Sequence, residues 1–484
     1  MPHPLLPCIY VCMLFNPDIA TRPQLLVIQK CLQLFIGSSP IIQLESFSNW
    51  ETLVSYDHVL VAKPRSAEEG TEALDGSIRN FTSVTVAAGI NQAELISELE
   101  DQGYAFPHGP MVYDVTIGGA IATASHNSIH TAPSMGGLMT RARLVDGLGN
   151  VKEFSQDADT LVMKALRCNL GLLGILFEIE LRVVQQEDVI VRNVFTPLRN
   201  LFNPDFIHNT VLDNYFAMGL YAPYNSLTDE EAKSVLDTGK VPVTWNSSND
   251  LVMLQLIRPA SSHVKFTIVD ERPQSAPNVT KVSVSQDAFK KELSLPAYTK
   301  VPLTRSMHFP ASYFPSLMMI EYIVEDSSFA AGATALRVLS SVLNEASYKN
   351  GVQAMEEGIF KWFKGTDCLI CPGSVPVGWS EQEEPVDQSY FASFHLHRRV
   401  GSPDDENRTD AFHTAMVTAW DQSGLNGLPH WGKGFQHFPN LKQRIKRGYG
   451  IDLTIFKIIR NTLDPVGVFT DDCLRRVFAE PRYY

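Results

Sequence analysis

A stretch almost free of bulky side chains, Asp114 to His126 (DVTIGGAIATASH), constrains the fold more than any other feature of the sequence. Gly118, Gly119 and the alternating alanines let the backbone approach a flat or anionic ligand closely, and exposed N–H groups there can bind it. Close packing of a helix on a sheet needs the same small residues, so both interpretations stay open. The glycine spacing differs from that of a Rossmann fingerprint, and no Walker-type motif occurs. We expect a glycine- and alanine-rich loop.

The segments on either side of this loop have clear periodicities. Residues 81–89 alternate like a strand, Asn91 and Glu94 form a capping-box pattern, and Gly103 stands where a helix would end. Residues 141–154 predict a hairpin, residues 159–170 a helix, and the segment from Ile175 a half-buried strand.

Beyond residue 185 the pattern changes to strand-like runs separated by long connections. These runs are Val241–Trp245, Leu251–Ile257, Met318–Val324 and Gln388–His397, with one amphipathic helix near residues 330–346. This arrangement predicts an antiparallel sheet with helices on one side, and an α+β fold overall. Because 484 residues exceed what one core supports, we expect two domains with a boundary near residue 185.

Composition excludes several classes of protein. The net charge of −13 argues against general nucleic-acid binding, and no apolar run is long enough for a transmembrane helix. Seven scattered cysteines exclude a disulfide scaffold. For Cys368 and Cys371 we favour structural thiols over metal or redox use. His395 and His397 share one strand face, which we expect to be half-exposed rather than metal-binding; no metal site is predicted.

Several motifs in fixed order resemble the vanillyl-alcohol-oxidase-type (PCMH) FAD flavoproteins, and most closely their sugar-1,4-lactone oxidase branch, of the arabinonolactone and gulonolactone oxidase type. In the N-terminal half these are residues 84–90, 114–121, 125–126, 136–137 and 171–175. In the C-terminal half they are Pro429–Lys433 (PHWGK) and residues 464–469. The residues matching the opening of the branch are 49–50 and 64–69.

The resemblance implies a domain order and a set of site residues. It implies an irregular flank over 1–48, an FAD-binding domain over 49–185 that is shortened near 70–80, a substrate domain over 186–435, and a segment over 436–484 that returns to the FAD domain. FAD would be lined by Thr116, Ile117, Gly118, Gly119, Ala122, Thr123, Ser125, His126, Gly174 and Ile175. The catalytic residues would be His430, Lys433 and Lys361.

The implied reaction is oxidation of a sugar lactone by hydride transfer to flavin, with molecular oxygen as acceptor giving hydrogen peroxide. The resemblance also implies an intracellular, mitochondrial or endoplasmic-reticulum protein with peripheral membrane association. His430 would hydrogen-bond the substrate or act as a general base, and Lys433 would be an electrostatic anchor. Taken alone, however, Pro429–Lys433 is more typical of a packed turn with a solvated lysine.

Two departures from the family pattern qualify these expectations. The family's Gly-x-Gly-His-Ser flavin loop is absent from the 484 residues, so we predict FAD that is bound non-covalently. The family's Glu-x-Arg pair aligns with Ile359 and Lys361. Ile359 cannot hydrogen-bond a hydroxyl group, and Lys361 keeps the charge without the forked guanidinium. Two alternatives therefore remain: an oxidase of alditols or other secondary alcohols, and a non-catalytic remnant that binds flavin weakly.

Overall fold

The computed structural model describes residues 82–273, 284–307, 317–353, 355–374, 389–399 and 402–469, with residues 474, 477 and 478. It also gives the backbone of a hairpin, β1 (Ile41–Ser48) and β2 (Ser55–Lys63). Strand β1 falls within the flank predicted to be irregular. The family-like residues at 49–50 and 64–69 and the shortened segment at 70–80 lie outside the described residues.

The first sheet contains the N-terminal motifs. Its strands are β3 (Thr82–Ala87), β7 (Ile175–Gln185), β5 (Met139–Val145) and β6 (Val151–Ser155), in that order, with β4 (Tyr104–Ala105) beside β7. The predicted hairpin is confirmed, because β5 and β6 pair in antiparallel register across the turn. The predicted capped helix is α2 (Gln92–Asp101), whose capping box joins Asn91 and Glu94. The helix predicted from residue 159 is α4 (Thr160–Leu166).

The small-residue stretch is a helix where a loop was expected. Helix α3 (Ile117–Ala122) begins after Thr116, whose hydroxyl accepts a hydrogen bond from the Gly119 N–H. A Cβ atom on Gly118 would lie 2.8 Å from the carbonyl oxygen of Ala88. Close packing of the helix against the strand therefore accounts for Gly118 without a ligand, which is the second of the two interpretations that the sequence left open.

The second sheet is larger and entirely antiparallel between neighbours, in the order β11-β8-β10-β9-β13-β14-β12-β15. Its strands are β8 (Asp188–Pro197), β9 (Phe216–Tyr221), β10 (Leu251–Pro259), β11 (Tyr298–Pro302), β12 (Leu317–Glu325), β13 (Glu357–Lys364), β14 (Tyr390–Arg399) and β15 (Leu428–Pro429). The expected strand at 241–245 is wrong, because those residues form turns. The chain passes from one sheet to the other between Gln185 and Asp188; the domain boundary itself stays a prediction.

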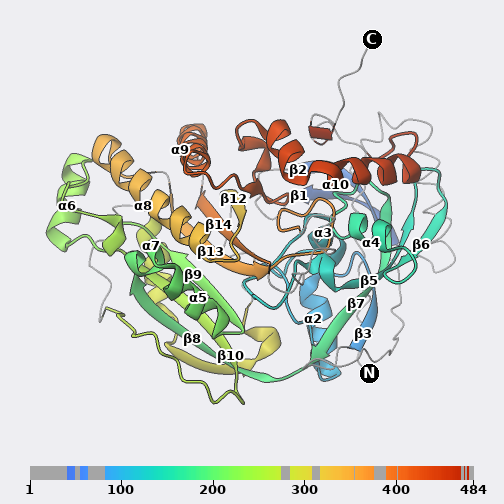
Figure 1. Ribbon diagram of the computed structural model, residues 1–484, viewed down its shortest axis with the longest axis horizontal. Helices are drawn as coiled ribbons and strands as arrows, with labels where there is room; N and C mark the ends of the chain where they lie inside the picture. The colour runs from blue at the N-terminus through green and yellow to red at the C-terminus, as the bar shows by residue number, and fades with distance from the viewer. Residues whose placement is uncertain are drawn as a thin grey trace, which may run out of the picture.

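The two faces of the large sheet are covered differently. Helices α8 (Ala330–Asn350) and α9 (Pro403–Gln422) pack on one face, where Tyr322, Phe360 and Phe394 join a large hydrophobic core. The opposite face meets the first sheet's domain and α7 (Val284–Ser294). Figure 1 shows the two sheets side by side, with α8 and α9 above the larger one. Helices α5 (Pro204–Leu212) and α6 (Asp229–Thr238) complete this half.

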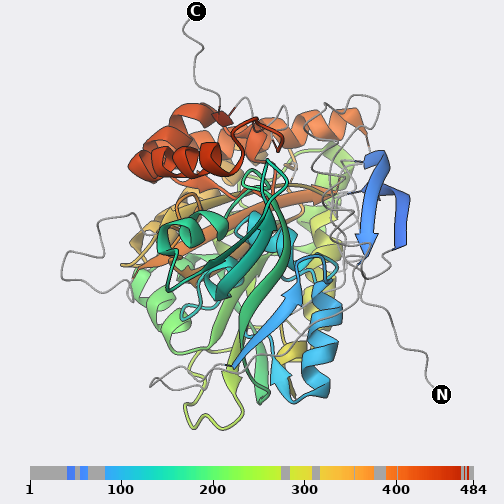
Figure 2. The same ribbon diagram turned by 90° about the vertical axis from the view of Figure 1, so that its right-hand side faces the viewer.

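The C-terminal helix joins the N-terminal half. Helix α10 (Leu441–Leu463) contributes Ile445, Tyr449 and Phe456 to the hydrophobic core that includes α2, α3 and β7. Figure 2 shows α10 lying across the top of the first sheet's domain. Cys368 and Cys371 are joined by a disulfide, so the preference for thiols there is wrong.

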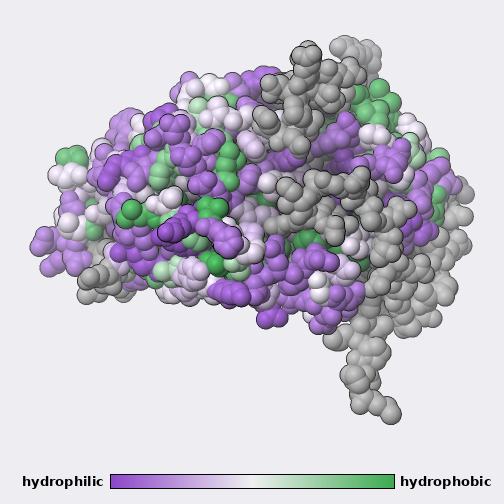
Figure 3. All heavy atoms as spheres, turned by 60° about the horizontal axis from the view of Figure 1, so that its bottom comes forward, coloured by the Kyte–Doolittle hydropathy of each residue, from purple (hydrophilic) through white to green (hydrophobic). Residues whose placement is uncertain are grey.

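Two observations bear on membranes. Among the helices that the structure describes, none is both long and apolar enough to cross a bilayer. On the face drawn in Figure 3, hydrophilic side chains predominate among the described residues, and hydrophobic ones form small, separated areas.

Candidate active site

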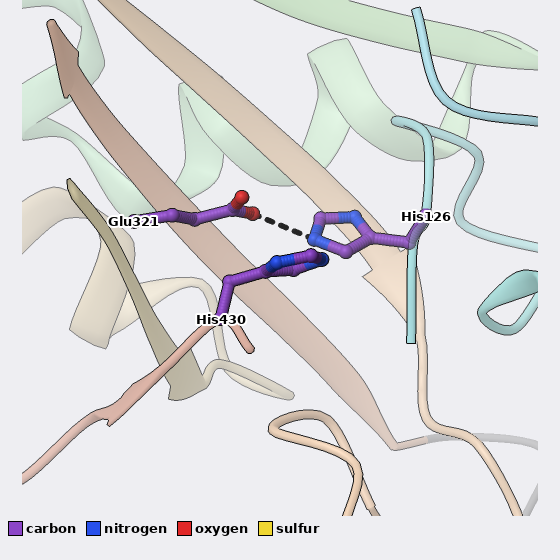
Figure 4. Close-up of side chains that lie close together, drawn as sticks. All are labelled: His126, Glu321 and His430. Carbon is purple, nitrogen blue, oxygen red and sulfur yellow. Dashed lines mark hydrogen bonds and ion pairs between the residues drawn. The ribbon is translucent and has the colours of Figure 1, made fainter. Parts of the chain in front are cut away.

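A buried glutamate on β12 gathers three histidines from both halves of the chain. The Glu321 Oε1 atom lies 2.7 Å from His126 Nε2 and 2.9 Å from His395 Nε2. His395 is the register partner of Glu321 on β14, whereas His126 follows α3 in the other half. His430 follows β15, and its backbone N–H donates a hydrogen bond to the backbone carbonyl oxygen of Glu321 at 3.1 Å. Figure 4 shows the rings of His126 and His430 converging on the carboxylate.

His126 has a polar partner at each ring nitrogen. Its Nδ1 lies 3.0 Å from the Asn127 carbonyl oxygen, and its Nε2 faces the Glu321 carboxylate. Both partners are acceptor groups, so each of them can accept a hydrogen bond from the ring nitrogen that it faces. Although burial acts in the opposite direction, the pKa of Glu321 is held well below its usual value, and the hydrogen bond with His126 is one cause. His126 and Glu321 therefore form a buried ion pair, with Phe363 stacked on the His126 ring.

His430 is held in one tautomer. The Gly432 N–H donates to His430 Nδ1 at 2.9 Å, and burial lowers the pKa of His430 to about 3. The neutral ring therefore carries its proton on Nε2. This arrangement makes Nε2 a donor toward a bound oxygen atom and favours hydrogen bonding over proton abstraction for His430.

Lys361 brings an amine into the same cluster. It lies on β13, opposite Ser393, and only 4% of its surface is exposed. Burial lowers the pKa of Lys361 to about 8, against the attraction of Glu321. Its charge acts on His395 and His430 as well as on Glu321. An amine with a pKa near 8 can exchange a proton at physiological pH.

The residues expected to line FAD form an open strip that leads to this cluster. Gly119 is exposed, and Ala122, Thr123 and Ser125 are half-buried on the outer side of α3. The strip ends near His430, since a Cβ atom on Gly432 would lie 3.2 Å from Thr123 Oγ1 and 3.1 Å from His430 Cε1. A surface of such small side chains fits a flat cofactor placed between α3 and His430.

Not every predicted site residue reaches this strip. Ile117 is fully buried in the core behind α3, and Thr116 caps that helix. Gly174 and Ile175 stand at the start of β7, where a Cβ atom on Gly174 would lie 2.6 Å from the Val145 carbonyl oxygen. The side chain of Lys433 is half-buried, and its charge acts on His430 and Lys361.

Two features escaped the sequence analysis. The expectation of a half-exposed face at His395 and His397 is wrong, because both side chains are 3% exposed. Burial lowers the pKa of His395 well below its usual value. Glu321 was not singled out, although a lone carboxylate within the apolar strand Leu317–Glu325 was the available signal.

The spacing of the cluster also bears on metals. One ligand atom from each of His126, Glu321 and His430 lies within 4.8 Å of the others. A metal would require His126 to lose a proton and would stand beside the Lys361 ammonium, two conditions that oppose a cation. The absence of a metal site stays a prediction.

Two family models match separate parts of the chain. Residues 72–155 match the model of an FAD binding domain, and residues 321–477 match that of D-arabinono-1,4-lactone oxidase. The chain is 26% identical over 438 residues to the mitochondrial L-galactono-1,4-lactone dehydrogenase of Arabidopsis thaliana, covering 82% of this chain and 68% of that protein. It is 33% identical to the L-gulonolactone oxidase of Bos taurus, over 21% of this chain and 23% of that protein.

A solved structure shares the fold. The cholesterol oxidase from B. sterolicum superposes with a TM-score of 0.64 and 13% identity, covering 91% of this chain and 97% of that one. Glu321 and His430 lie within the region that matches the lactone oxidase model, and His126 lies within the FAD-binding match. The chain thus shares the fold of this oxidase and is similar to FAD-binding proteins in its N-terminal half and to sugar-1,4-lactone oxidases in its C-terminal half.

Proposed function

We propose that the protein oxidises a sugar 1,4-lactone of the arabinono- or gulono-type with FAD as cofactor. One observation carries this proposal: a histidine from the FAD-binding match and a glutamate from the lactone-oxidase match form a buried ion pair at 2.7 Å. A dry polar centre between the two halves is where a cofactor held by one half would meet a substrate held by the other.

The flavin would rest on the strip formed by Gly119, Ala122, Thr123 and Ser125. When bound, FAD supplies the acceptor for a hydride from the hydroxyl-bearing carbon of the substrate. Because the family's histidine-containing loop is missing from the sequence, this FAD is non-covalent. Gly174 and Ile175, from the start of β7, are the proposed contacts on the far side of the cofactor.

The residues of the cluster divide the remaining work. His430 donates from Nε2 to an oxygen of the lactone and orients it. Lys361, in its uncharged form, takes the proton of the hydroxyl group as the hydride leaves, because its pKa of about 8 suits a base near neutral pH. The pair of His126 and Glu321 contributes to the electrostatic potential at Lys361 and His430. Lys433 adds a positive charge near the cluster.

The electron acceptor and the cellular site follow the relatives. We propose molecular oxygen as acceptor, with hydrogen peroxide as product. The Arabidopsis relative is named a dehydrogenase and the bovine one an oxidase, so oxygen uptake must be compared with reduction of an artificial dye. The name of the Arabidopsis relative includes "mitochondrial", which supports an intracellular site for this chain as well.

An alditol or another secondary alcohol is the second candidate substrate. Ile359 favours this second substrate class. It lies on β13 opposite His395 of β14, and its side chain offers no hydrogen bond where the family has a glutamate. A weakly binding remnant is less well supported, because the ion pair, Lys361 and His430 are all in place. Lactones and alditols can be compared in one assay, so this choice is open to direct test.

The test uses the purified full chain loaded with FAD. We expect absorbance near 450 nm that leaves with the supernatant after acid precipitation, and bleaching of that band when arabinono- or gulono-1,4-lactone is added without oxygen. Flavin that stays with the precipitate would contradict non-covalent binding. Bleaching by alditols alone would replace the lactone with the second candidate.

A further inference from the structure

The disulfide between Cys368 and Cys371 closes a four-residue ring beside the catalytic cluster. Both cysteines are buried in the hydrophobic core that includes α2, α3 and β7. A ring this short restricts the unfolded chain less than a long one, so stabilisation of the fold is a weak reason for its presence. In reducing intracellular compartments, disulfides are rare and are usually catalytic or redox-sensing. The contacts of the ring therefore indicate its role better than its effect on stability does.

The first of these contacts leads to His430. Within the ring, the Ile370 carbonyl oxygen accepts a hydrogen bond from Trp431 Nε1 at 2.7 Å, and both residues are buried. Trp431 stands between His430 and Gly432, whose N–H donates to the His430 ring. The indole ring also stacks on Tyr449 of α10. A shift of the Ile370 carbonyl group would therefore be passed to the imidazole that is proposed to orient the substrate.

The second contact leads to His126. Gly373, two residues after the ring, packs directly on Phe363, since a Cβ atom on Gly373 would lie 2.6 Å from Phe363 Cε2. Phe363 stacks on the His126 ring, with 3.8 Å between the ring centroids. The Gly373 carbonyl oxygen accepts from the Thr366 N–H at 2.8 Å, and the Thr366 hydroxyl accepts from the Ser134 N–H at 2.8 Å. The loop thus adjoins a second histidine of the cluster.

A cavity lies next to this loop. Its volume is about 530 Å³, and the described residues that line it include Pro372, Ser374 and Phe391. Pro372 follows Cys371 directly in the chain, and Phe391 stacks on Phe363. The volume is typical of small-molecule sites, so a small dithiol or hydrogen peroxide in the cavity would lie one residue from the disulfide.

We propose that the Cys368–Cys371 disulfide is a reversible redox switch that positions His430 and His126. This inference rests on the proposed function, because it acts on residues assigned there. In reduction, a dithiol gives two electrons and two protons: the S–S bond breaks, two thiols form, and the dithiol closes to its own disulfide. Hydrogen peroxide, the proposed product of turnover, reverses the change, because it takes the two electrons and two protons and leaves two water molecules.

Opening the ring loosens both contacts of the loop. The Ile370 carbonyl group is then no longer held against Trp431 by a closed ring, and Gly373 is no longer held against Phe363. A displacement of about 1 Å in a positioning group can cost about 100-fold in rate, so a smaller shift suffices for a clear effect. The reduced protein should therefore turn over slowly while it still binds FAD.

The experiment compares the oxidised, reduced and reoxidised full chain, each loaded with FAD. Dithiothreitol is the reductant, is removed before each assay, and thiols are counted in denaturant. Reduction should lower kcat/KM for arabinono-1,4-lactone about 10-fold or more, with the dissociation constant of FAD changed less than about twofold. Hydrogen peroxide should restore the rate. The paired variant Cys368→Ala with Cys371→Ala should match the reduced protein, release two fewer thiols on reduction and respond to neither reagent.

The matched control is Cys168→Ala. Cys168 lies against the same ring, with its Sγ atom 3.5 Å from the Ile370 carbonyl oxygen, but it is a free thiol. This variant should keep the full response to dithiothreitol. Trp431→Phe removes the donor to Ile370 and keeps an aromatic ring, so its kcat/KM should be low in both redox states.

Two outcomes would overturn the switch: a reduced chain with unchanged kcat/KM, or a response to dithiothreitol that persists in the paired variant. If the paired variant does not fold, the reversal by peroxide in the unmodified chain decides. An oxidised chain whose flavin no lactone bleaches would instead contradict the proposed function. An active chain that is insensitive to reduction would contradict the switch alone.

Discussion

The two faces of the eight-stranded sheet are built from the same strands but carry opposite chemistry. On one face, Tyr322, Phe360 and Phe394 pack against α8 and α9 in a continuous apolar core. On the other, Glu321, Lys361 and their histidine neighbours are just as deeply buried. Because successive residues of a strand alternate between faces, one short segment contributes to both.

The apolar face and the polar face therefore contribute differently to stability and to activity. Burying apolar area stabilises the folded chain, whereas burying charges costs free energy unless they are paired. The apolar face therefore supplies stability, and the polar face costs part of it. We therefore expect the two faces to respond differently to mutation: changes on the apolar face should lower stability, and changes on the polar face should lower activity.

The largest effect is expected for Lys361→Met. Loss of the proton acceptor should lower the rate of flavin reduction about 10²- to 10⁴-fold. The same change should raise the free energy of unfolding at pH 7 by about 3 kcal/mol, because the pKa of Lys361 falls from 10.5 to about 8 on folding. Above pH 8 the gain should shrink, since the folded amine is then uncharged. Stopped-flow absorbance and chemical denaturation measure the two quantities, with Lys364→Met on the same strand as control.

The apolar face should show the reverse pattern. Phe394 packs against Phe360 and Trp420, and Phe394→Ala should lower the free energy of unfolding by about 3–5 kcal/mol. Turnover per bound flavin should stay within about twofold of the unmodified protein. A Phe394→Ala protein with unchanged stability and much lower turnover would contradict the assignment of stability to the apolar face and activity to the polar face.

A third comparison concerns His430. His430→Phe keeps the ring volume but removes the donor, and should cost about 3 kcal/mol of transition-state stabilisation, or about 150-fold in kcat/KM. His430→Gln keeps an N–H donor and should lose clearly less. Equal losses in both variants would show that the imidazole does more than donate a hydrogen bond. Unchanged kcat/KM in both would show that Pro429–Lys433 is a packed turn without a role in catalysis.

The smallest effect is expected on the cofactor strip. Ala122→Leu adds bulk where the flavin would lie and should raise the dissociation constant of FAD about tenfold, measured by flavin fluorescence. Ala122 is the better test than Gly119, because a Cβ atom at Gly119 would lie 2.9 Å from Thr116 Oγ1 and disturb the helix cap. Unchanged FAD affinity with unchanged stability would show that the cofactor does not bind against α3.

Local patterns predicted the elements but not the polar face. The hairpin at 141–154, the capping box at Asn91 and the strand from Ile175 follow from neighbours in sequence, and each is present. The site depends instead on register between distant strands: His395 meets Glu321 across a gap of about 70 residues, and His126 reaches the same carboxylate from the other half. No local period contains that information.

The same limit explains the specific errors. Two histidines alternating along β14 are typical of a half-exposed strand, but both are buried in the folded chain. Small residues at 118–124 are compatible with a loop or a helix. In the structure residues 117–122 are helical, and Gly118 packs closely against Ala88. Family resemblance supplied His430 and Lys361, which residue patterns alone would have left as turn and strand residues.

The pH dependence of anaerobic flavin reduction tests the account most directly. With a saturating sugar lactone, the rate constant for bleaching near 450 nm should rise with pH and level off above an inflection near 8, as the Lys361 amine loses its proton. Lys361→Arg keeps the positive charge but cannot release a proton, so its rate should be low and without that inflection. An inflection near 8 that persists in Lys361→Arg, or a rate independent of pH in the unmodified protein, would contradict the assignment of this buried cluster as the catalytic centre.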